Sequence, residues 1–177
     1  GVVTGAADGY WRMKKMPSAT LLHLGPGYAN GMANLHNAKR AFSGMVNIVG
    51  DHATWHLKYD APLTSDLFAH VNIHSDWVRK SKSSDDLAQI AAQAVSISKS
   101  GWGKICTVIA PANHAWEDGA LDREPVKVPP IEKVADSKII ELKTLIEKSK
   151  KCALLLGGDA LTEKNIKLAS PPSNNAH

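Results

Sequence analysis

Three short apolar runs separated by helical patterns are the feature that most limits how this 177-residue chain can fold. The runs span residues 20–24, 45–49 and 104–110, and a shorter one spans 77–80. Strands that alternate with helices form parallel sheets through right-handed crossovers. Residues 105–111 are strongly apolar, as in strands that are covered on both faces. The sequence therefore predicts an α/β fold: a parallel sheet with helices on both faces.

The stretch from 21 to 30, LLHLGPGYAN, passes from a buried strand through a tight turn into a helix. Gly25 and Gly27 allow backbone conformations and close approaches that a side chain would block, and Pro26 has no N–H to lose at a helix entrance. His23 lies near the carboxyl end of the predicted strand, where open α/β sheets bind ligands. We therefore expect a ligand close to this turn.

Two neighbouring motifs make this stretch specific: AADGY at 6–10 and NLHNA at 34–38. Together with the GPG turn and Asn30, they resemble the pyrimidine-binding domain of thiamine diphosphate enzymes. The similarity is to the branch that contains acetolactate synthase and benzoylformate decarboxylase. Trp11 stands where that branch carries alanine, and the resemblance covers residues 1–111.

The resemblance implies a thiamine diphosphate-binding fold for a pyrimidine-binding domain at 1–111, lacking its N-terminal part. The proline-bearing segment 112–130 is interpreted as a linker. Residues 131–169, with a predicted strand at 152–156 between two helices, are expected to be the first βα layer of a second α/β domain, the family's central domain. Residues 170–177 are expected to be a disordered tail.

Residues 1–13 are predicted to form the body of a helix, with an apolar stripe made of Val2, Val3, Ala6 and Tyr10. In the resembled family, a glutamate that hydrogen-bonds the aminopyrimidine ring lies eight residues before the aspartate of AADGY, here Asp8. That count reaches the position before Gly1. We therefore expect the catalytic glutamate to precede the sequence given.

His23 is the residue that we assign to catalysis. Its position relative to AADGY matches a histidine of benzoylformate decarboxylases that handles protons on cofactor-bound intermediates, and imidazole titrates near neutrality. The alternative is a core histidine whose ring is satisfied between two leucines. The resemblance also implies cofactor contacts for residues of the following turn and helix start: Gly25, Pro26, Gly27 and Asn30.

Asp51, His52 and His56 are candidates for the active-site mouth, because the family's chain crosses that mouth after the second strand. Pyruvate decarboxylases carry histidines there, although theirs are adjacent. Family members commonly have Gly-Gln where this chain has Gly50 and Asp51. The departure leaves the substrate open.

Two histidine pairs have the i, i+4 spacing of helical zinc sites: His52 with His56, and His70 with His74. Neither pair contains the glutamate of HExxH. The surrounding segment 53–75 has little helical periodicity, so the sequence predicts no metal site in this chain.

Composition excludes several other classes. The formal charge is +4, and the lysines between 127 and 167 are not interleaved with aromatics, so we expect no nucleic-acid partner. No apolar run approaches the ~20 residues of a membrane helix. Cys106 and Cys152 lie in apolar runs, as buried free thiols do. We expect a cytoplasmic protein.

The resemblance implies part of an enzyme that uses thiamine diphosphate and Mg²⁺ to decarboxylate a 2-oxo acid and join the product to a second one, as acetolactate synthase does. The family's metal-binding GDG…N motif is absent from the sequence. The diphosphate-binding domain is therefore expected on the same or a neighbouring subunit of a homodimer or homotetramer, and this chain alone is expected to be inactive. The alternatives are a simple decarboxylase of the benzoylformate type and a non-catalytic binding or oligomerisation module.

Overall fold

The computed structural model describes residues 1–119 and 122–169, so the predicted tail at 170–177 lies outside the described residues. The chain divides into two compact units, Gly1–Ile131 and Glu132–His177. Each unit is described by itself.

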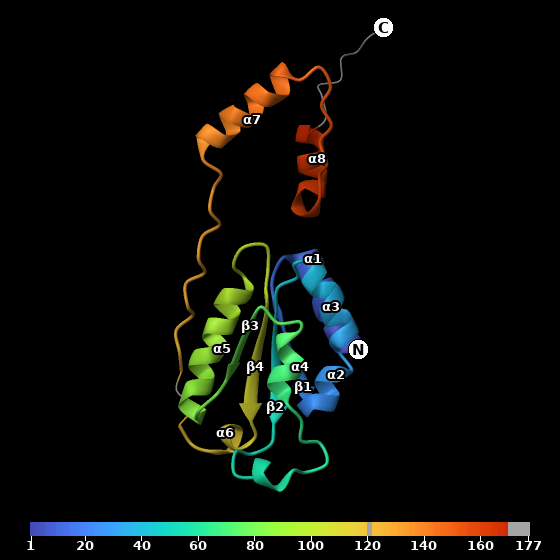
Figure 1. Ribbon diagram of the computed structural model, residues 1–177. Helices are drawn as coiled ribbons and strands as arrows, with labels where there is room; N and C mark the ends of the chain where they lie inside the picture. The colour runs from blue at the N-terminus through green and yellow to red at the C-terminus, as the bar shows by residue number, and fades with distance from the viewer. Residues whose placement is uncertain (120–121, 170–177) are drawn as a thin grey trace. The chain divides into compact units, whose positions relative to one another are not determined.

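The first unit is built on one parallel sheet, with strand order β1-β2-β4-β3 (Figure 1). Its strands are β1 (Ser18–His23), β2 (Met45–Asp51), β3 (Trp77–Lys80) and β4 (Ile105–Pro111). Every neighbouring pair is parallel. The predicted α/β fold with a parallel sheet is confirmed.

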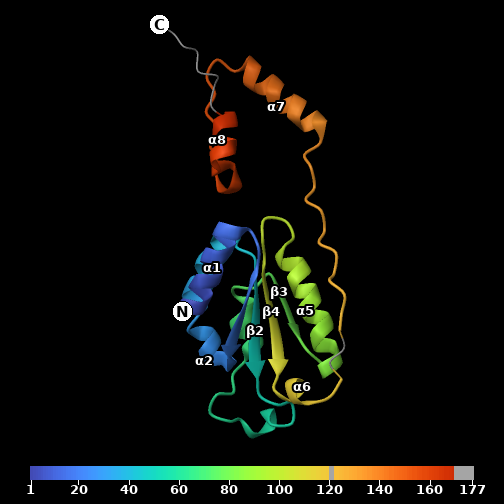
Figure 2. The same ribbon diagram turned by 180° about the vertical axis from the view of Figure 1, so that it is seen from behind.

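Helices cover both faces of this sheet, and the two views agree on which helix lies where (Figures 1 and 2). One face carries α1 (Val2–Lys14), α2 (Leu24–Ala29), α3 (Met32–Arg40) and α4 (Leu67–Asn72). The other face carries α5 (Ser84–Ser98). A 3₁₀ turn, η1 (Leu57–Tyr59), and the short α6 (Asn113–Trp116) lie near the carboxyl ends of the strands.

The period of two along a strand explains how one sheet serves two cores. Met45 and Val49 of β2 enter the core under α1 to α4, whereas Val46 enters the core under α5. In β1, Leu22 is buried on the first face, but Leu21 on the second face is 76% exposed. The face of the sheet that carries α5 is therefore exposed to solvent along β1.

The face by which α1 packs differs from the predicted stripe. Its buried residues are Thr4, Ala7 and Trp11, while the predicted stripe is exposed: Val2, Val3, Ala6 and Tyr10. A Cβ at Gly44 would lie 2.5 Å from the Trp11 ring, and one at Gly103 would lie 2.6 Å from it. The indole thus fills a space that two glycines leave open, and this contact, which periodicity cannot reveal, decides the buried face.

Asp8 of the AADGY motif joins α1 to the residues before β2. Its carboxylate accepts hydrogen bonds from Arg12 Nε and Nη2, both at 2.9 Å, and from the Ser43 hydroxyl. Burial alone would raise the pKa of Asp8, but the hydrogen bonds from Arg12 and Ser43 outweigh burial and hold this pKa below its usual value. The aspartate of the AADGY motif thus has a structural role, because it links α1 to the residues before β2.

Asp8→Asn is expected to remove part of the acid dependence of stability. Because the folded-state pKa is depressed, the ionised carboxylate stabilises the fold above the unfolded-state pKa of ~3.9, and this contribution is lost as the pH falls through the folded-state value. In urea unfolding, the gap between wild type and variant should be constant above pH ~5 and should shrink below ~4. The exposed Asp60→Asn is the control. A gap that does not change with pH would contradict the assignment.

The second unit contains α7 (Asp136–Lys148), the 3₁₀ turn η2 (Gly158–Leu161) and α8 (Glu163–Ala169). The strand predicted at 152–156 was wrong, since these residues have no regular secondary structure. A strand needs a hydrogen-bonded neighbour, and the described part of this unit supplies none. Cys152 is exposed for the same reason, against expectation, whereas Cys106 is buried in β4. Burial raises the pKa of the Cys106 thiol to about 12.

No helix in residues 1–119 or 122–169 has both the length and the apolar character needed to cross a membrane.

Candidate active site at the carboxyl edge of the sheet

A pocket of about 630 Å³ lies at the carboxyl ends of β1, β2 and β4, where the α5 face is open along β1. Its walls are mainly apolar, with side chains from strands, from the helices α5 and α6, and from a loop: Leu21, Ile48, Trp55, Leu87, Ala110 and Trp116. Its polar side chains are His23, Asp51, His52 and His56. An apolar pocket with a few converging polar groups is the usual form of a small-molecule site.

His23 is the last residue of β1, and its side chain is exposed toward this pocket while Leu22 and Leu24 are buried. The alternative of a core histidine therefore does not hold. The chain turns at Leu24, whose φ is 53°, and not at the GPG sequence. GPG instead lies in the first turn of α2, where Pro26 loses no helical hydrogen bond because the first N–H groups of a helix have no partner.

The two glycines of GPG serve different neighbours. A Cβ at Gly25 would lie 2.0 Å from the Ser65 hydroxyl oxygen, so Gly25 allows the loop before α4 to approach α2. A Cβ at Gly27 would lie 3.2 Å from the Cβ of His23. Gly27 thus borders the candidate catalytic side chain.

The other predicted cofactor contacts do not line the main pocket. Gly25 and Pro26 line a separate, smaller pocket of about 210 Å³, together with Ser65 and His70. Asn30 is at the opposite end of α2 from His23. Of the predicted residues, the structure therefore brings together His23, Asp51, His52 and His56, with Gly27 beside them.

Asp51 ends β2 and is held by a cation that the sequence reasoning missed. Its carboxylate accepts a hydrogen bond from Lys80 Nζ at 2.6 Å and another from the backbone N–H of His52 at 2.8 Å. Lys80 ends β3, and its position at the carboxyl end of a predicted parallel strand was the signal that could have found it. Because both carboxylate oxygens are engaged, Asp51 orients the chain at His52.

His52 and His56 lie side by side at the pocket. Their ring centroids are 5.4 Å apart, and His56 also contacts the rings of Trp55 and Tyr59, each at 5.6 Å. The Nε2 atom of His52 is buried and has no hydrogen-bond partner among the described residues. A buried polar atom without a partner is costly, so this nitrogen is a candidate contact for a ligand.

Residues 1–74, which contain all four polar residues of this pocket, match the family model described as "Thiamine pyrophosphate enzyme, N-terminal TPP binding domain". Thiamine pyrophosphate is thiamine diphosphate, so the resemblance seen in the sequence is confirmed.

A relative among the curated proteins matches a larger part of the chain. The chain is 46% identical over 160 residues to the Mycobacterium tuberculosis (strain H37Rv) protein named "Putative acetolactate synthase large subunit IlvX". The match covers 90% of this chain and 30% of the relative. The chain thus spans less than a third of the length of this curated relative.

Solved structures of thiamine diphosphate enzymes share the fold. Benzoylformate decarboxylase from Polynucleobacter necessarius matches 83% of this chain and 28% of its own, with a TM-score of 0.71 and 17% identity. The 4-hydroxybenzoylformate decarboxylase of Rhodococcus jostii RHA1 matches 88% of this chain and 26% of its own, with a TM-score of 0.60 and 20% identity. At these identities the likeness concerns the fold alone.

Proposed function

We propose that this chain supplies the pyrimidine-binding wall of the active site in an acetolactate synthase-like enzyme, which decarboxylates one 2-oxo acid and joins the product to another. The observation that carries the proposal is the convergence of His23, His52 and His56 in one apolar pocket within the family-matched residues. The name of the mycobacterial relative supports the synthase reaction.

The pocket suits the aminopyrimidine end of thiamine diphosphate. Its apolar walls can contact a flat ring, and His52 Nε2 has an unused hydrogen-bonding position. Among the described residues, no three His, Cys, Asp or Glu side chains come together as metal ligands. Lys80 is already paired with Asp51. We therefore assign the diphosphate and Mg²⁺ to a diphosphate-binding domain of the same or a neighbouring subunit, in a homodimer or homotetramer.

When bound, thiamine diphosphate supplies the carbon nucleophile and the electron sink that loss of CO₂ from a 2-oxo acid requires. The chain's own residues do the rest. His23 holds or releases a proton at its imidazole on the open side of the pocket. His52 hydrogen-bonds the ligand through Nε2, and Asp51 keeps His52 in place through the backbone N–H. Leu21, Trp55 and Trp116 form apolar walls against the bound ring.

A simple decarboxylase is the second candidate, and the position of His23 favours it. An imidazole that can protonate the decarboxylated carbon lets the product leave as an aldehyde, whereas the synthase must keep that carbon unprotonated until the second 2-oxo acid arrives. Product analysis with pyruvate distinguishes the two. It uses the assembled enzyme, which is this chain together with the diphosphate-binding domain and bound thiamine diphosphate and Mg²⁺. Acetolactate supports the synthase, and acetaldehyde supports the decarboxylase.

The isolated 177-residue chain is expected to bind thiamine diphosphate weakly, with a Kd in the ~millimolar range, because a single small ring provides limited contact. Amide resonances of Gly50, Ala53 and Ala112, at the pocket, should shift on titration. Thiamine without the diphosphate should cause the same shifts. With thiamine, the resonances of Gly101 and Gly103, at the other end of the sheet, should not shift.

Two results would contradict this assignment. Micromolar binding that depends on Mg²⁺ would mean that the chain contains a phosphate site. Shifts confined to Gly101 and Gly103 on addition of thiamine, which has no phosphate, would place the ring at the amino end of the sheet and not at the proposed site.

A further inference from the structure

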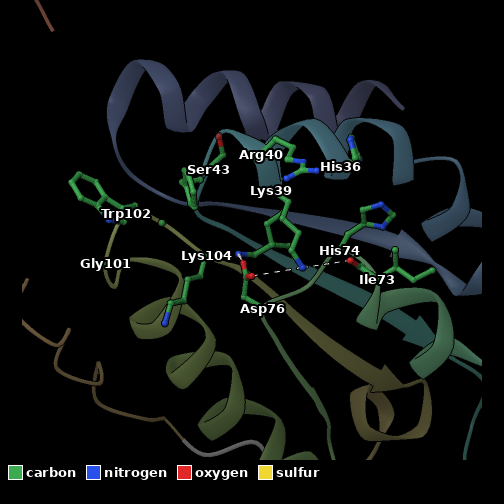
Figure 3. A pocket seen from close by; sticks show the side chains of 13 residues that line it. His36, Lys39, Arg40, Ser43, Ile73, His74, Asp76, Gly101, Trp102 and Lys104 are labelled. Atoms are coloured by element: carbon green, nitrogen blue, oxygen red, sulfur yellow. Dashed lines mark hydrogen bonds and ion pairs between the residues drawn. The ribbon is translucent and has the colours of Figure 1, made fainter. Parts of the chain in front are cut away.

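A second pocket, of about 710 Å³, lies at the amino end of the sheet (Figure 3). It is lined by residues that precede or begin β2, β3 and β4, together with one face of α3. Because β2 runs the length of the sheet at ~3.3 Å per residue, this cleft is roughly 20 Å from the candidate active site. Nothing in the proposed function uses it.

Basic side chains dominate this cleft. His36, Lys39 and Arg40 have the i, i+3, i+4 spacing that puts them on one face of α3, and Figure 3 shows this face above the cleft. Among the described residues that line it, Asp76 is the one acidic side chain. Its carboxylate already accepts a hydrogen bond from the Ile105 N–H at 2.8 Å and lies 3.8 Å from Lys39 Nζ.

Arg40 has an exposed guanidinium group that is free to bind a ligand. Within residues 1–119 and 122–169, no hydrogen bond or ion pair engages it. A guanidinium presents paired N–H donors that match the oxygens of a phosphate or carboxylate. With Asp76 already engaged, the cleft has positive charge available for an anion.

His74 contributes a further unused group to the wall. It is 8% exposed, and its Nδ1 has no hydrogen-bond partner among the described residues. Its ring meets the ring of His36 edge to face, with centroids 6.1 Å apart. Burial, and then the charges of His36 and Lys39, lower the pKa of His74, so its imidazole is neutral at neutral pH.

Two large aromatic side chains are exposed on the same cleft: Trp102 at 64% and Phe42 at 59%. The loop before β4 carries Trp102 between Gly101 and Gly103, and its conformation depends on these two glycines. Gly103 has φ 114°, and a Cβ there would lie 2.3 Å from the Phe42 carbonyl oxygen. Figure 3 shows Trp102 at one end of the cleft and the basic face of α3 at the other. An exposed indole offers a flat apolar surface for stacking.

We propose that this cleft binds a small anion that also carries a flat ring, of the nucleoside monophosphate class. Arg40 and His36 receive the phosphate, and Trp102 receives the ring. The volume lies within the ~300–1,000 Å³ of small-molecule pockets, which favours a small ligand over a macromolecule. The proposal is independent of the thiamine diphosphate site.

Titration of the 177-residue chain with AMP tests the proposal. Calorimetry should give a Kd of ~10⁻⁵ to 10⁻³ M for a ligand of this size. The amide resonances of Gly101 and Gly103 should shift, and those of Gly50 and Ala53 should not. Inorganic phosphate should bind more weakly than AMP at the same resonances.

Substitutions test the two ends of the cleft separately: Arg40 for phosphate binding and Trp102 for ring binding. Arg40→Gln is expected to weaken AMP binding by ~tenfold or more, since it removes charge-assisted hydrogen bonds. Arg40→Lys should keep part of the affinity. Trp102→Leu should weaken the binding of AMP while leaving that of phosphate unchanged. Both positions, Arg40 and Trp102, are exposed, and circular dichroism checks that the three variants keep the fold.

Lys82→Gln is the matched control, because it removes one exposed positive charge outside the cleft. Equal losses from Arg40→Gln and Lys82→Gln would mean general charge attraction and would overturn the site. AMP and phosphate binding with equal affinity would overturn the role of the ring. The absence of any AMP-induced shift at ~10 mM, well above the expected Kd, would overturn the whole proposal.

Discussion

Replacing His23 by alanine is expected to lower the turnover of the assembled enzyme by ~10²- to 10⁴-fold, the usual contribution of a positioned acid–base group. His23 is exposed toward an apolar pocket at the end of β1, with Gly27 against its Cβ. In that position an imidazole can exchange protons with a bound 2-oxo acid without a competing partner from the sheet. Steady-state kinetics with pyruvate measure the effect.

The pH profile separates a chemical role from a structural one. A pH-dependent limb of the wild-type rate profile that reports proton transfer by His23 should be lost in both His23→Ala and His23→Gln. The exposed Lys82→Ala, outside the pocket, serves as the control and should keep wild-type turnover. If the decarboxylase assignment is right, His23→Ala should also lower the ratio of aldehyde to acetolactate. Unchanged turnover with an unchanged pH profile would remove His23 from the mechanism.

Trp11→Ala is expected to lower the free energy of unfolding by ~3–5 kcal/mol, as large-to-small changes of buried aromatic residues do. Trp11 is 6% exposed, and its ring fills the space over Gly44 and Gly103. The loss would be a large part of the ~5–15 kcal/mol that stabilises a typical domain. Urea unfolding followed by circular dichroism measures it.

Met13→Ala, on the same helix, is the matched control for Trp11. Met13 is 83% exposed, so its replacement should change stability by no more than ~0.5 kcal/mol. Gly44→Ala should destabilise in the same direction as Trp11→Ala, because the added Cβ would collide with the indole. A loss below ~1 kcal/mol for Trp11→Ala would show that the site collapses around the smaller side chain.

The order of strands and helices could be predicted from the sequence because it depends on local patterns. The apolar runs that became β2 and β4 are short and bounded, and the segments between them have helical periodicity. The motif at 6–10 identified the family, although its Asp8 proved to bind Arg12 and Ser43 within the fold.

Some residues of the candidate site could be found from the sequence, and others only from the tertiary structure. The position of His23 at the carboxyl end of a strand was visible in the sequence, since parallel strands present their carboxyl ends at one edge. The pairing of Asp51 with Lys80 was not, because the strands β2 and β3 that carry them are separated by β4 in the sheet. Strand order is a tertiary property.

Tertiary structure alone decided which faces are buried and where the chain turns. Helical spacing favoured the stripe of Val2 and Tyr10, but the space above two glycines admits the Trp11 ring, and the helix rotates to fill it. The strand expected at 152–156 has the right composition and no partner, so it stays unpaired. The sequence by itself determined the local preferences and the family. The neighbours that satisfy those preferences, and the two clefts at opposite ends of the sheet, exist only once segments far apart in the chain have packed together.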